Sequence, residues 1–307
     1  MKHAFLIIAH NNWWQLKQLI KQLDSEFHDI YIHIDKRCKD FDQGIFSEMT
    51  LKSKIYFFQE YKVYWGGYSL VEVELFLLEN AFRNNYDYYH IISGGDLLIT
   101  SNQEFDAFFE NNKGFEFIDF DDNKLINDPE ILRRVRLYHF LQNFRRISGS
   151  SFINSIFVFF ERCLLLLQII LQIDRTKKLN WTIKYGSQWV SITNDLTKEV
   201  LNHKKNVKEV FRFTNCADEL FIQTIAYNSM FRDKIFENEI DSLMNNMRVV
   251  DWKRGKNGSP YTFCSSDFEN IIHSKGLFAR KFSEEIDKEI ILKINNYVNG
   301  VDYEISL

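Results

Sequence analysis

The alternation of strand and helix patterns over the first hundred residues is the feature that most constrains the fold. Residues 4–9 form an unbroken apolar run, as a strand buried on both faces of a sheet requires. Apolar side chains then recur at three- and four-residue spacing between Trp13 and Leu23, which predicts a helix. Another helix is predicted from Ser69, and further strands at 30–34, 54–58, 86–92 and 114–120. The pattern predicts an α/β fold with a mainly parallel sheet covered by helices.

From about residue 125 this alternation stops, and an apolar stretch extends from Phe152 to Ile173. As a helix it would be roughly 33 Å long, enough to cross a bilayer by length alone. Asn154, Glu161 and Gln168 recur every seven residues, however, and would give the helix a polar stripe with a charge at its middle. A spanning helix is therefore not expected. A helix packed on the body of the protein is the preferred interpretation, and a helix lying in a membrane interface is the alternative.

Basic residues flank this stretch and would suit contact with anionic lipid headgroups. They are Arg145 and Arg146 before it, and Arg175, Lys177 and Lys178 after it. Strand and helix patterns then resume at 188–193, 195–201 and 217–227. Since the chain contains only two prolines and no linker rich in Pro, Gly or Ser, we expect one domain over residues 1–307 with a helical insert at about 140–180.

Charge and cysteine content argue against several classes of protein. A formal net charge of -4 disfavours nucleic-acid binding, which needs a basic face. The four cysteines are scattered, lack metal-site spacing and are too few for a disulfide scaffold, which favours a reducing compartment. The apolar run at the amino terminus spans only about six residues and is interpreted as a strand rather than a signal peptide. We therefore expect a cytoplasmic location.

Polar residues at strand ends and helix starts are the first candidates for chemistry. His33 and Asp35 end the second predicted strand and, being two residues apart, face the same side. Residues 93–96, Ser-Gly-Gly-Asp, follow a later strand, where open α/β sheets bind ligands. By position alone, ligand contact and a plain charged surface remain equal alternatives. Asp218 and Glu219 start a helix. Two acids at this position often have no role beyond a favourable interaction with the helix dipole.

Acidic and basic pairs offer two ways to hold a diphosphate. An Asp-x-Asp tripeptide occurs at Asp40–Asp42, in a loop typical of a turn, and at Asp119–Asp121, after a predicted strand. The second is the better candidate for a divalent metal, although the tripeptide alone is weak support. Arg280 and Lys281 are the alternative, because cations can stabilise the negative charge of a departing diphosphate. A surface pair of cations would show the same pattern.

A series of short motifs follows these candidates along nearly the whole chain. They are Ala9–His10, His33–Lys36, Tyr64–Ser69, Ser93–Asp96, Gly186–Trp189, Ala217–Glu219, Arg248 with Asp251–Trp252, Ser259–Pro260 and Leu277–Phe282. In this order they resemble the core-2/I-branching glycosyltransferases (glycosyltransferase family 14), which also include the peptide O-xylosyltransferases and many bacterial sugar transferases. Leu98 stands where the family usually has proline, which suggests a repacked loop.

The resemblance implies a GT-A type of fold, a UDP-sugar donor and an inverting transfer that yields a β-linkage, typically without an essential metal or other cofactor. Glu219 matches the family's acidic motif and would remove the proton from the acceptor hydroxyl as it attacks the anomeric carbon. Lys281 matches the family's diphosphate-binding lysine. The second cation has no clear counterpart, and Arg254 is preferred over Arg280 for that role.

The resemblance also assigns binding residues. The donor is expected to contact His10, His33, Asp35, Ser69, Asp96, Arg254, Arg280 and Lys281. The acceptor is expected to contact Trp65, Gly186, Ser187, Gln188 and Trp189. Trp189 would offer an aromatic face to a sugar ring, or would equally suit the core. Asp96 falls near where metal-dependent relatives keep their Asp-x-Asp.

GlcNAc is the expected sugar, with xylose and glucuronic acid as alternatives. The apolar, cationic insert favours a bacterial-type enzyme that builds surface polysaccharide on a glycan or lipid-linked oligosaccharide acceptor. Such an enzyme would contact the inner face of the plasma membrane through residues 152–173. A non-catalytic sugar-binding homologue remains an alternative, as does a nucleotide-sugar hydrolase or nucleotidyltransferase on a similar sheet.

Overall fold

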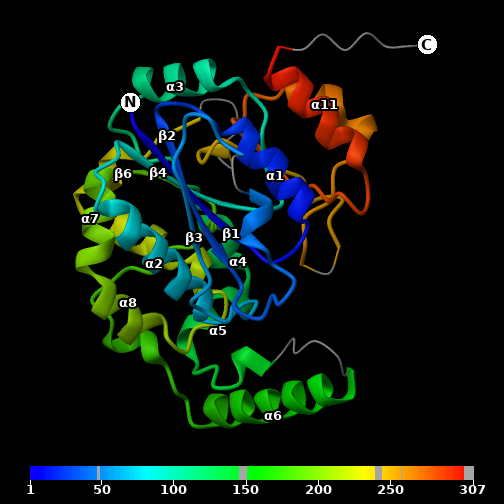
Figure 1. The fold of residues 1–307 in the computed structure, drawn as a ribbon. Helices are drawn as coiled ribbons and strands as arrows, with labels where there is room; N and C mark the ends of the chain where they lie inside the picture. The colour runs from blue at the N-terminus through cyan, green and yellow to red at the C-terminus, as the bar shows by residue number, and fades with distance from the viewer. Residues whose placement is uncertain (47–48, 145–150, 239–243, 257, 301–307) are drawn as a thin grey trace.

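The computed structural model describes residues 1–46, 49–144, 151–238, 244–256 and 258–300. A five-stranded sheet in the order β3-β2-β1-β4-β6 lies at its centre (Figure 1). The strands are β1 (His3–Ala9), β2 (His28–Ile34), β3 (Ile55–Phe58), β4 (Tyr88–Ser93) and β6 (Ser191–Thr193). The first four run parallel and β6 runs antiparallel to β4, so the predicted α/β fold with a mainly parallel sheet is confirmed.

A second sheet of three short strands, in the order β5-β8-β7, was not predicted from the sequence. Its strands are β5 (Asp96–Leu98), β8 (Phe278–Arg280) and β7 (Arg248–Val250). β5 and β8 are antiparallel, with Asp96 opposite Arg280. The strand predicted at 114–120 is instead reduced to single bridges, one of them between Phe117 and Ser191.

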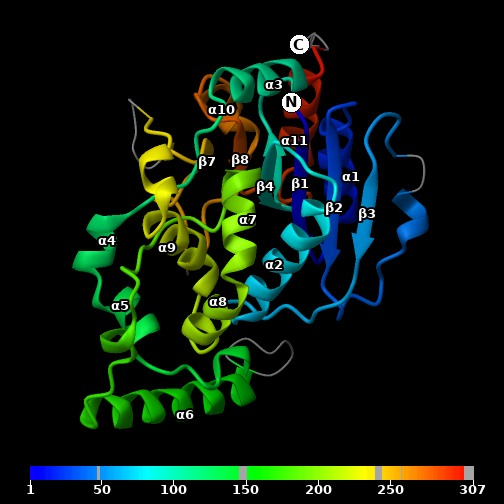
Figure 2. The same cartoon turned by 90° about the vertical axis from the view of Figure 1, so that its left-hand side faces the viewer.

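Helices cover both faces of the central sheet (Figures 1 and 2). On one face lie α1 (Trp13–Gln22), α3 (Asn102–Asn111), α10 (Phe268–Ile272) and α11 (Lys288–Val298). On the other lie α2 (Ser69–Phe82), α7 (Asn194–Asn202), α8 (Lys204–Phe211) and α9 (Phe221–Tyr227). The helices predicted after the first and third strands and from residue 195 are therefore confirmed.

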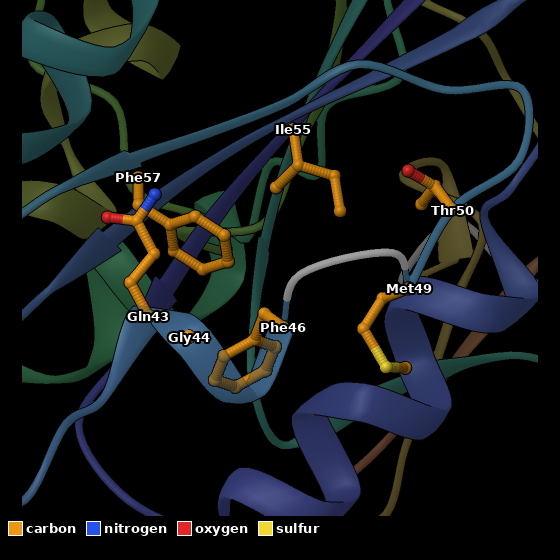
Figure 3. Close-up of a pocket in the computed structure, with 7 residues that line it drawn as sticks. All are labelled: Gln43, Gly44, Phe46, Met49, Thr50, Ile55 and Phe57. Atoms are coloured by element: carbon orange, nitrogen blue, oxygen red, sulfur yellow. The ribbon is translucent and has the colours of Figure 1, made fainter.

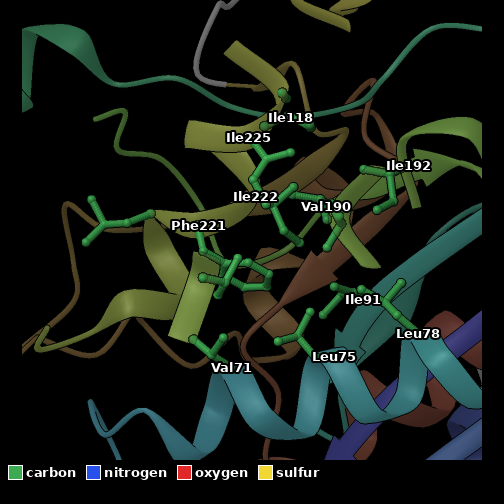
Figure 4. Packing of buried hydrophobic residues seen from close by; sticks show 14 of the residues in the cluster. Val71, Leu75, Leu78, Ile91, Ile118, Val190, Ile192, Phe221, Ile222 and Ile225 are labelled. Atoms are coloured by element: carbon green, nitrogen blue, oxygen red, sulfur yellow. The ribbon is translucent and has the colours of Figure 1, made fainter. Parts of the chain in front are cut away.

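The side chains of β1 point alternately into two hydrophobic cores, because successive residues of a strand face opposite sides of the sheet. Phe5 and Ile7 belong to the core beneath α1 and α11. Leu6 and Ile8 belong to the core beneath α2 and α9. Figure 4 shows side chains of α2, among them Leu75, pointing toward those of α9. The central sheet is thus held between two apolar layers.

Three further helices lie between α3 and β6 in the chain. They are α4 (Asp122–Asn127), α5 (Pro129–Arg136) and α6 (Ser151–Ile170). Asp128 caps α5 by accepting a hydrogen bond from Glu130 N, and Pro129 occupies the first turn, where a missing N–H is no loss. Figures 1 and 2 both place α6 at the end of the molecule opposite α3. α3 lies at the amino ends of the parallel strands, where its Asp106 contacts His28 at 2.8 Å. The carboxyl edge of the sheet therefore faces the end that carries α6.

A surface hollow lies beside the start of β3 (Figure 3). It is lined by Gln43, Gly44, Phe46, Met49, Thr50, Ile55 and Phe57. None of these side chains is titratable, and the hollow adjoins the amino end of the strand. The candidate chemistry lies elsewhere, at the carboxyl edge.

Candidate functional site

The carboxyl edge of the parallel sheet gathers the residues that follow β1, β2 and β4. Asp35 N donates a hydrogen bond to Ala9 O, and Gly94 N donates one to Ile8 O, each at 3.1 Å. These bonds hold the segments after the three strands side by side. His10, Asp35 and the loop around Gly94 therefore lie at one edge, where open α/β sheets bind ligands.

Asp35 is buried at this edge and holds the side chain of Arg37. Arg37 donates to the Asp35 carboxylate from its backbone N at 2.9 Å and from Nη2 at 2.6 Å, and Val63 N donates to it at 3.3 Å. Burial opposes the charged form, yet these hydrogen bonds lower the pKa of Asp35. The Arg37 guanidinium also lies 4.8 Å from the centre of the Tyr64 ring. Arg37 was not identified from the sequence, where the available signal is a cation two residues after a strand-end acid.

His33 and Ser69, both predicted to bind the donor, instead hold the backbone of a loop. His33 is fully buried, and its Nε2 accepts a hydrogen bond from Tyr61 N at 3.1 Å. Burial lowers the pKa of His33 to about 4, so the ring is neutral near pH 7. Ser69 Oγ, also buried, accepts from Tyr64 N at 2.9 Å. Both side chains are buried and position residues 61–64.

His10 and Lys281 lie near each other at the same edge. Desolvation lowers the pKa of His10 against the effect of Asp35, and the charges of Lys281 and Arg37 add to the lowering. A Cβ placed on Gly95 would lie 3.7 Å from Lys281 Cγ, so the stem of Lys281 passes the loop after β4. Within the described parts of the chain, Lys281 forms no ion pair, and its ammonium is available to an anion.

Arg280, in contrast, is partly buried and lies between Asp96 and Trp189. Its Nη1 lies 3.5 Å from Asp96 Oδ1, and its guanidinium lies 4.2 Å from the centre of the Trp189 ring. Asp96 Oδ2 accepts a hydrogen bond from Ser93 N at 2.6 Å. Burial raises the pKa of Asp96, an effect that the charge of Arg280 opposes. Arg280 thus supports the loop after β4 and covers one face of Trp189.

Arg254, the residue preferred from the sequence as the second diphosphate cation, already has two anionic partners. Its Nε lies 2.5 Å from Asp251 Oδ2 and its Nη1 lies 2.8 Å from Asp267 Oδ1. The guanidinium also stacks on Tyr261 at 3.8 Å. The charge of Arg254 is therefore matched by two carboxylates, and that of Arg37 by one, Asp35.

Glu219 ends a short 3-10 helix, η4 (Ala217–Glu219), at a point where three motif segments meet. The chain enters η4 through Cys216, which has a left-handed φ of 50°. Cys216 N donates a hydrogen bond to Gly66 O at 2.8 Å, and Gly186 N donates one to Glu219 O at 3.0 Å. The segments around Gly66, Gly186 and Glu219, distant in sequence, are thereby joined by their backbones.

The side chain of Glu219 is 28% exposed and forms an ion pair with Arg134 of α5. Arg134 Nη1 donates to Glu219 Oε2 at 2.8 Å. This hydrogen bond holds the carboxylate in one orientation, as a general base requires. Arg134 was not identified from the sequence. The signal available there is a cluster of arginines at 133–136, which does not reveal the one that faces Glu219.

Two buried carboxyl groups accompany Glu219. Asp218 precedes it in the chain, and Glu74 lies in α2. Burial raises the pKa of Asp218 to about 7, and the charge of Glu219 adds to the effect. Burial, followed by the charge of Asp218, raises the pKa of Glu74. Gln188, predicted to bind the acceptor, donates from Nε2 to Glu74 Oε1 at 2.6 Å. Gln188 is therefore fixed by a buried acid, which the sequence shows only as one of three glutamates in α2.

The remaining predicted acceptor residues differ in what they can offer. A Cβ on Gly186 would lie 1.9 Å from Asp119 O, so only glycine fits there. Ser187 Oγ accepts a hydrogen bond from Trp189 N at 3.2 Å. Trp65 is 48% exposed and precedes the glycine that is bonded to Cys216. Trp65 is accordingly the aromatic residue better placed to meet a sugar near Glu219.

A profile of the Core-2/I-Branching enzyme family matches residues 3–272, which is most of the chain. The chain belongs to this family. The mixed sheet between two layers of helices is the GT-A type of α/β fold expected for a Core-2/I-branching enzyme.

Curated relatives of this Core-2/I-branching chain include xylosyltransferases. That of Ciona intestinalis is 24% identical over 327 residues, which cover 98% of this chain and 34% of that protein. Xylosyltransferase 2 of Rattus norvegicus is 22% identical over 334 residues, which cover 97% of this chain and 34% of that protein. The chain thus spans about a third of the length of these relatives.

Among solved structures, apo mouse xyloside xylosyltransferase 1 is similar with a TM-score of 0.36 and 11% identity, over 91% of this chain and 96% of that chain. Core-mannan synthase A of Aspergillus fumigatus, solved in an Mn/GDP form, has a TM-score of 0.37 and 14% identity, over 77% of this chain and 72% of that chain. At these scores neither structure locates a residue of the site in this Core-2/I-branching chain.

The Asp-x-Asp tripeptide at Asp119–Asp121 serves the fold of this Core-2/I-branching chain. Asp119 Oδ1 accepts a hydrogen bond from Asn246 N at 2.9 Å, and Asp121 Oδ1 caps α4 by accepting from Lys124 N at 2.8 Å. In the described ranges no three His, Cys, Asp or Glu side chains are grouped as a metal would require. The tripeptide that was the better metal candidate by position is therefore occupied by structural bonds.

Proposed function

We propose that this chain is an inverting glycosyltransferase that moves a sugar from a UDP-sugar to a hydroxyl group of a glycan acceptor. The convergence on Glu219 carries the proposal, because backbone hydrogen bonds join the family's motif segments around this partly exposed carboxylate. The segment 64–66 also connects Glu219 to the carboxyl edge, since Arg37 lies over Tyr64. An acid, an aromatic residue and available cations at one edge of the sheet suit sugar transfer.

In the proposed reaction, Glu219 takes the proton of the acceptor hydroxyl while its oxygen bonds to the anomeric carbon of the donor. The bond from that carbon to the diphosphate oxygen breaks on the opposite side, so an α-linked donor yields a β-linkage and UDP leaves. Lys281 stabilises the negative charge that UDP carries away. Arg134 orients Glu219 through its hydrogen bond to the carboxylate.

The donor is proposed to be UDP-GlcNAc. UDP-xylose is the second candidate, which the names of the curated relatives favour, and UDP-glucuronate the third. A single methylene or hydroxyl group in a pocket is enough to change this preference. The transfer is proposed to need no metal, because Lys281 supplies positive charge at the edge where the diphosphate would lie.

The setting is proposed to be bacterial surface polysaccharide synthesis, with a lipid-linked acceptor at the inner face of the plasma membrane. The apolar insert supports this proposal. It includes Phe152–Ile170, which by length and composition alone could cross a membrane.

A thermal-shift screen of UDP-GlcNAc, UDP-xylose and UDP-glucuronate tests the donor, because a ligand that binds the native state raises the Tm. The largest increase in Tm is expected with UDP-GlcNAc. An increase with UDP-xylose alone would make UDP-xylose the donor instead. Release of UDP is then measured with and without a glycan acceptor. Release that needs the acceptor supports a transferase, release without it indicates a hydrolase, and binding without any release indicates a non-catalytic homologue.

A further inference from the structure

Helix α6 turns its polar side toward the protein and its apolar side outward. Glu161 and Gln168, two residues of the predicted polar stripe, are buried, whereas Phe152 is 75% and Ile170 68% exposed. The sequence predicted a helix packed on the body of the protein or lying in a membrane interface, and α6 contacts the body through its polar side. The reversed polarity needs its own explanation, since a helix stabilised by a core buries its apolar side.

Hydrogen bonds from the polar stripe hold α6 against the segment that follows α5. Glu161 accepts from His139 Nδ1 and from Leu141 N, each at 3.0 Å. Gln168 accepts from Tyr138 N at 2.7 Å and donates to Tyr138 O at 3.0 Å. These contacts fix the middle and the end of α6 along the body, as the position of α6 in Figures 1 and 2 shows. A helix that crossed a bilayer would have to break all of them and expose Glu161 to hydrocarbon.

The exposed face of α6 carries an apolar row along its whole length, with the exposed polar residues Ser155 and Arg162 beside it. At about 3.6 residues per turn, the side opposite Glu161 and Gln168 is formed by a single row of residues. They are Phe152, Ile156, Phe159, Cys163, Leu166 and Ile170, all of them exposed. Only 11% of the stretch Phe152–Ile170 is buried, and its mean hydropathy is 1.8. Soluble proteins rarely leave such a continuous apolar surface uncovered.

The charges around this face favour lipid over a second copy of the chain. Arg162 is exposed at the border of the face, and Lys177 and Arg212 are exposed on the adjoining segments. Glu161 is the one acid in residues 151–173, and it is buried, while Asp174 of the adjoining segment is paired with Arg136. A second copy would therefore bring cations to cations across the interface, whereas anionic headgroups complement them.

We propose that the exposed face of α6 is a docking surface for a bilayer with anionic headgroups, with the helix lying in the plane of the interface. This deepens the proposed function, on whose peripheral location it rests, by naming the surface. It also orients the enzyme. The carboxyl edge of the sheet faces the end that carries α6, and α5, which bears Arg134, leads directly into the segment that holds α6. The site thus faces the side from which a lipid-linked acceptor would come.

Flotation of the full chain with vesicles tests the proposal. The vesicles are phosphatidylcholine with phosphatidylglycerol, or phosphatidylcholine alone, and the bound fraction is expected to be higher with the anionic lipid and to fall with salt. The variant Phe152→Ser/Phe159→Ser/Ile170→Ser should lower the bound fraction at least about tenfold, because it removes apolar area from the interface. Leu51→Ser/Ile126→Ser/Met230→Ser removes three equally exposed apolar side chains elsewhere and should leave binding unchanged.

Cys163 provides a second measurement, since it lies in the middle of the exposed face. In a Cys38→Ser/Cys264→Ser background, a polarity-sensitive dye on Cys163 should shift its emission to shorter wavelength when anionic vesicles are added. No vesicle binding by the unsubstituted chain, or binding that survives the triple substitution in α6, would overturn the proposal. Self-association without vesicle binding would assign the face to a second copy, and resistance to alkaline carbonate extraction would indicate a spanning helix; either outcome overturns it.

Sugar transfer is tested separately on a soluble acceptor. The triple α6 variant is expected to keep this activity, and Glu219→Gln is expected to keep vesicle binding. Failure of the docking surface and failure of the proposed reaction therefore give different results.

Discussion

Arg134 Nη1 donates a hydrogen bond to Glu219 Oε2 at 2.8 Å, and both side chains remain about a quarter exposed, at 27% and 28%. The pair joins α5 to the segment where three family motifs meet. A base held in this way is oriented, yet still within reach of solvent and of an acceptor. Because α5 leads into the segment that holds α6, the orientation of the base is also linked to the insert.

Replacing Glu219 by glutamine should remove the base and leave the shape of the site intact. We expect kcat to fall by about 10²- to 10⁴-fold, the usual contribution of a general base. UDP should bind as before, since binding does not use the carboxylate. Initial rates and thermal shifts with UDP measure the two effects. Glu130→Gln, an exposed acid of α5, is the matched control, and near-normal turnover of Glu219→Gln would remove Glu219 from its role.

Replacing Arg134 by methionine should lower kcat with little change in the donor KM, because Arg134 contacts the base. The carboxylate loses the hydrogen bond that orients it. Initial rates at varied donor concentrations measure kcat and the donor KM separately. Arg133→Met removes the neighbouring arginine, which pairs with Glu130, and should leave both constants unchanged. A rise in the donor KM without a fall in kcat would contradict the assigned role.

Lys281 and Arg254 should differ in their effect on donor binding. Lys281→Met is expected to raise the donor KM about tenfold, the value of one charge-assisted hydrogen bond. Arg254→Met should change it little, because Asp251 and Asp267 already match this charge. Donor titrations of both variants measure the difference. An equal rise in KM would mean that Arg254 leaves its carboxylates to bind the diphosphate.

The parts of the fold that could be predicted are those with local patterns. The apolar run of residues 4–9 identifies β1 because a strand covered on both faces must be apolar throughout. The second sheet could not be predicted, since its three-residue strands depend on partners far along the chain, such as Asp96 opposite Arg280. For α6 the polar stripe was visible, but an amphipathic pattern is the same whichever face meets the protein.

The candidate site shows the same division. The family motifs predicted roles for Glu219, Lys281 and Trp65. In the structure Glu219 pairs with Arg134, Lys281 lies near His10, and Trp65 is exposed. Arg134 and Arg37 were missed, because only the fold determines which cation meets a given acid. Motif residues also serve backbone positions, as the burial of His33 shows.

Stability should fall between pH 5 and pH 8 through Glu116. This carboxyl is buried and accepts hydrogen bonds from Thr193 N at 2.8 Å and Thr193 Oγ1 at 2.5 Å. Burial raises its pKa to about 7 from an ordinary value of 4.5, so its stabilising contribution is complete below the ordinary value and is lost as the pH rises through about 7.

Glu116→Gln should reduce the difference in unfolding free energy between pH 5 and pH 8 by about 2 kcal/mol. Urea unfolding at both pH values measures the difference. Glu26→Gln, an exposed acid, should leave it unchanged. If the two variants behave alike, Glu116 is not the group that titrates.

Sugar transfer should persist in excess EDTA. The resemblance to metal-independent transferases motivates this prediction, and the bonding of Asp119 and Asp121 agrees with it, since each carboxylate already accepts a backbone hydrogen bond. Initial rates with EDTA and with added Mn²⁺ measure the effect. Asp121→Asn is the informative variant, because asparagine also caps a helix well but is a poorer ligand for a divalent cation. Activity should survive this substitution. The prediction is wrong if EDTA abolishes activity, Mn²⁺ restores it, and Asp121→Asn also loses activity. Those results would indicate a metal bound at Asp119–Asp121, with Lys281 giving the diphosphate only additional stabilisation.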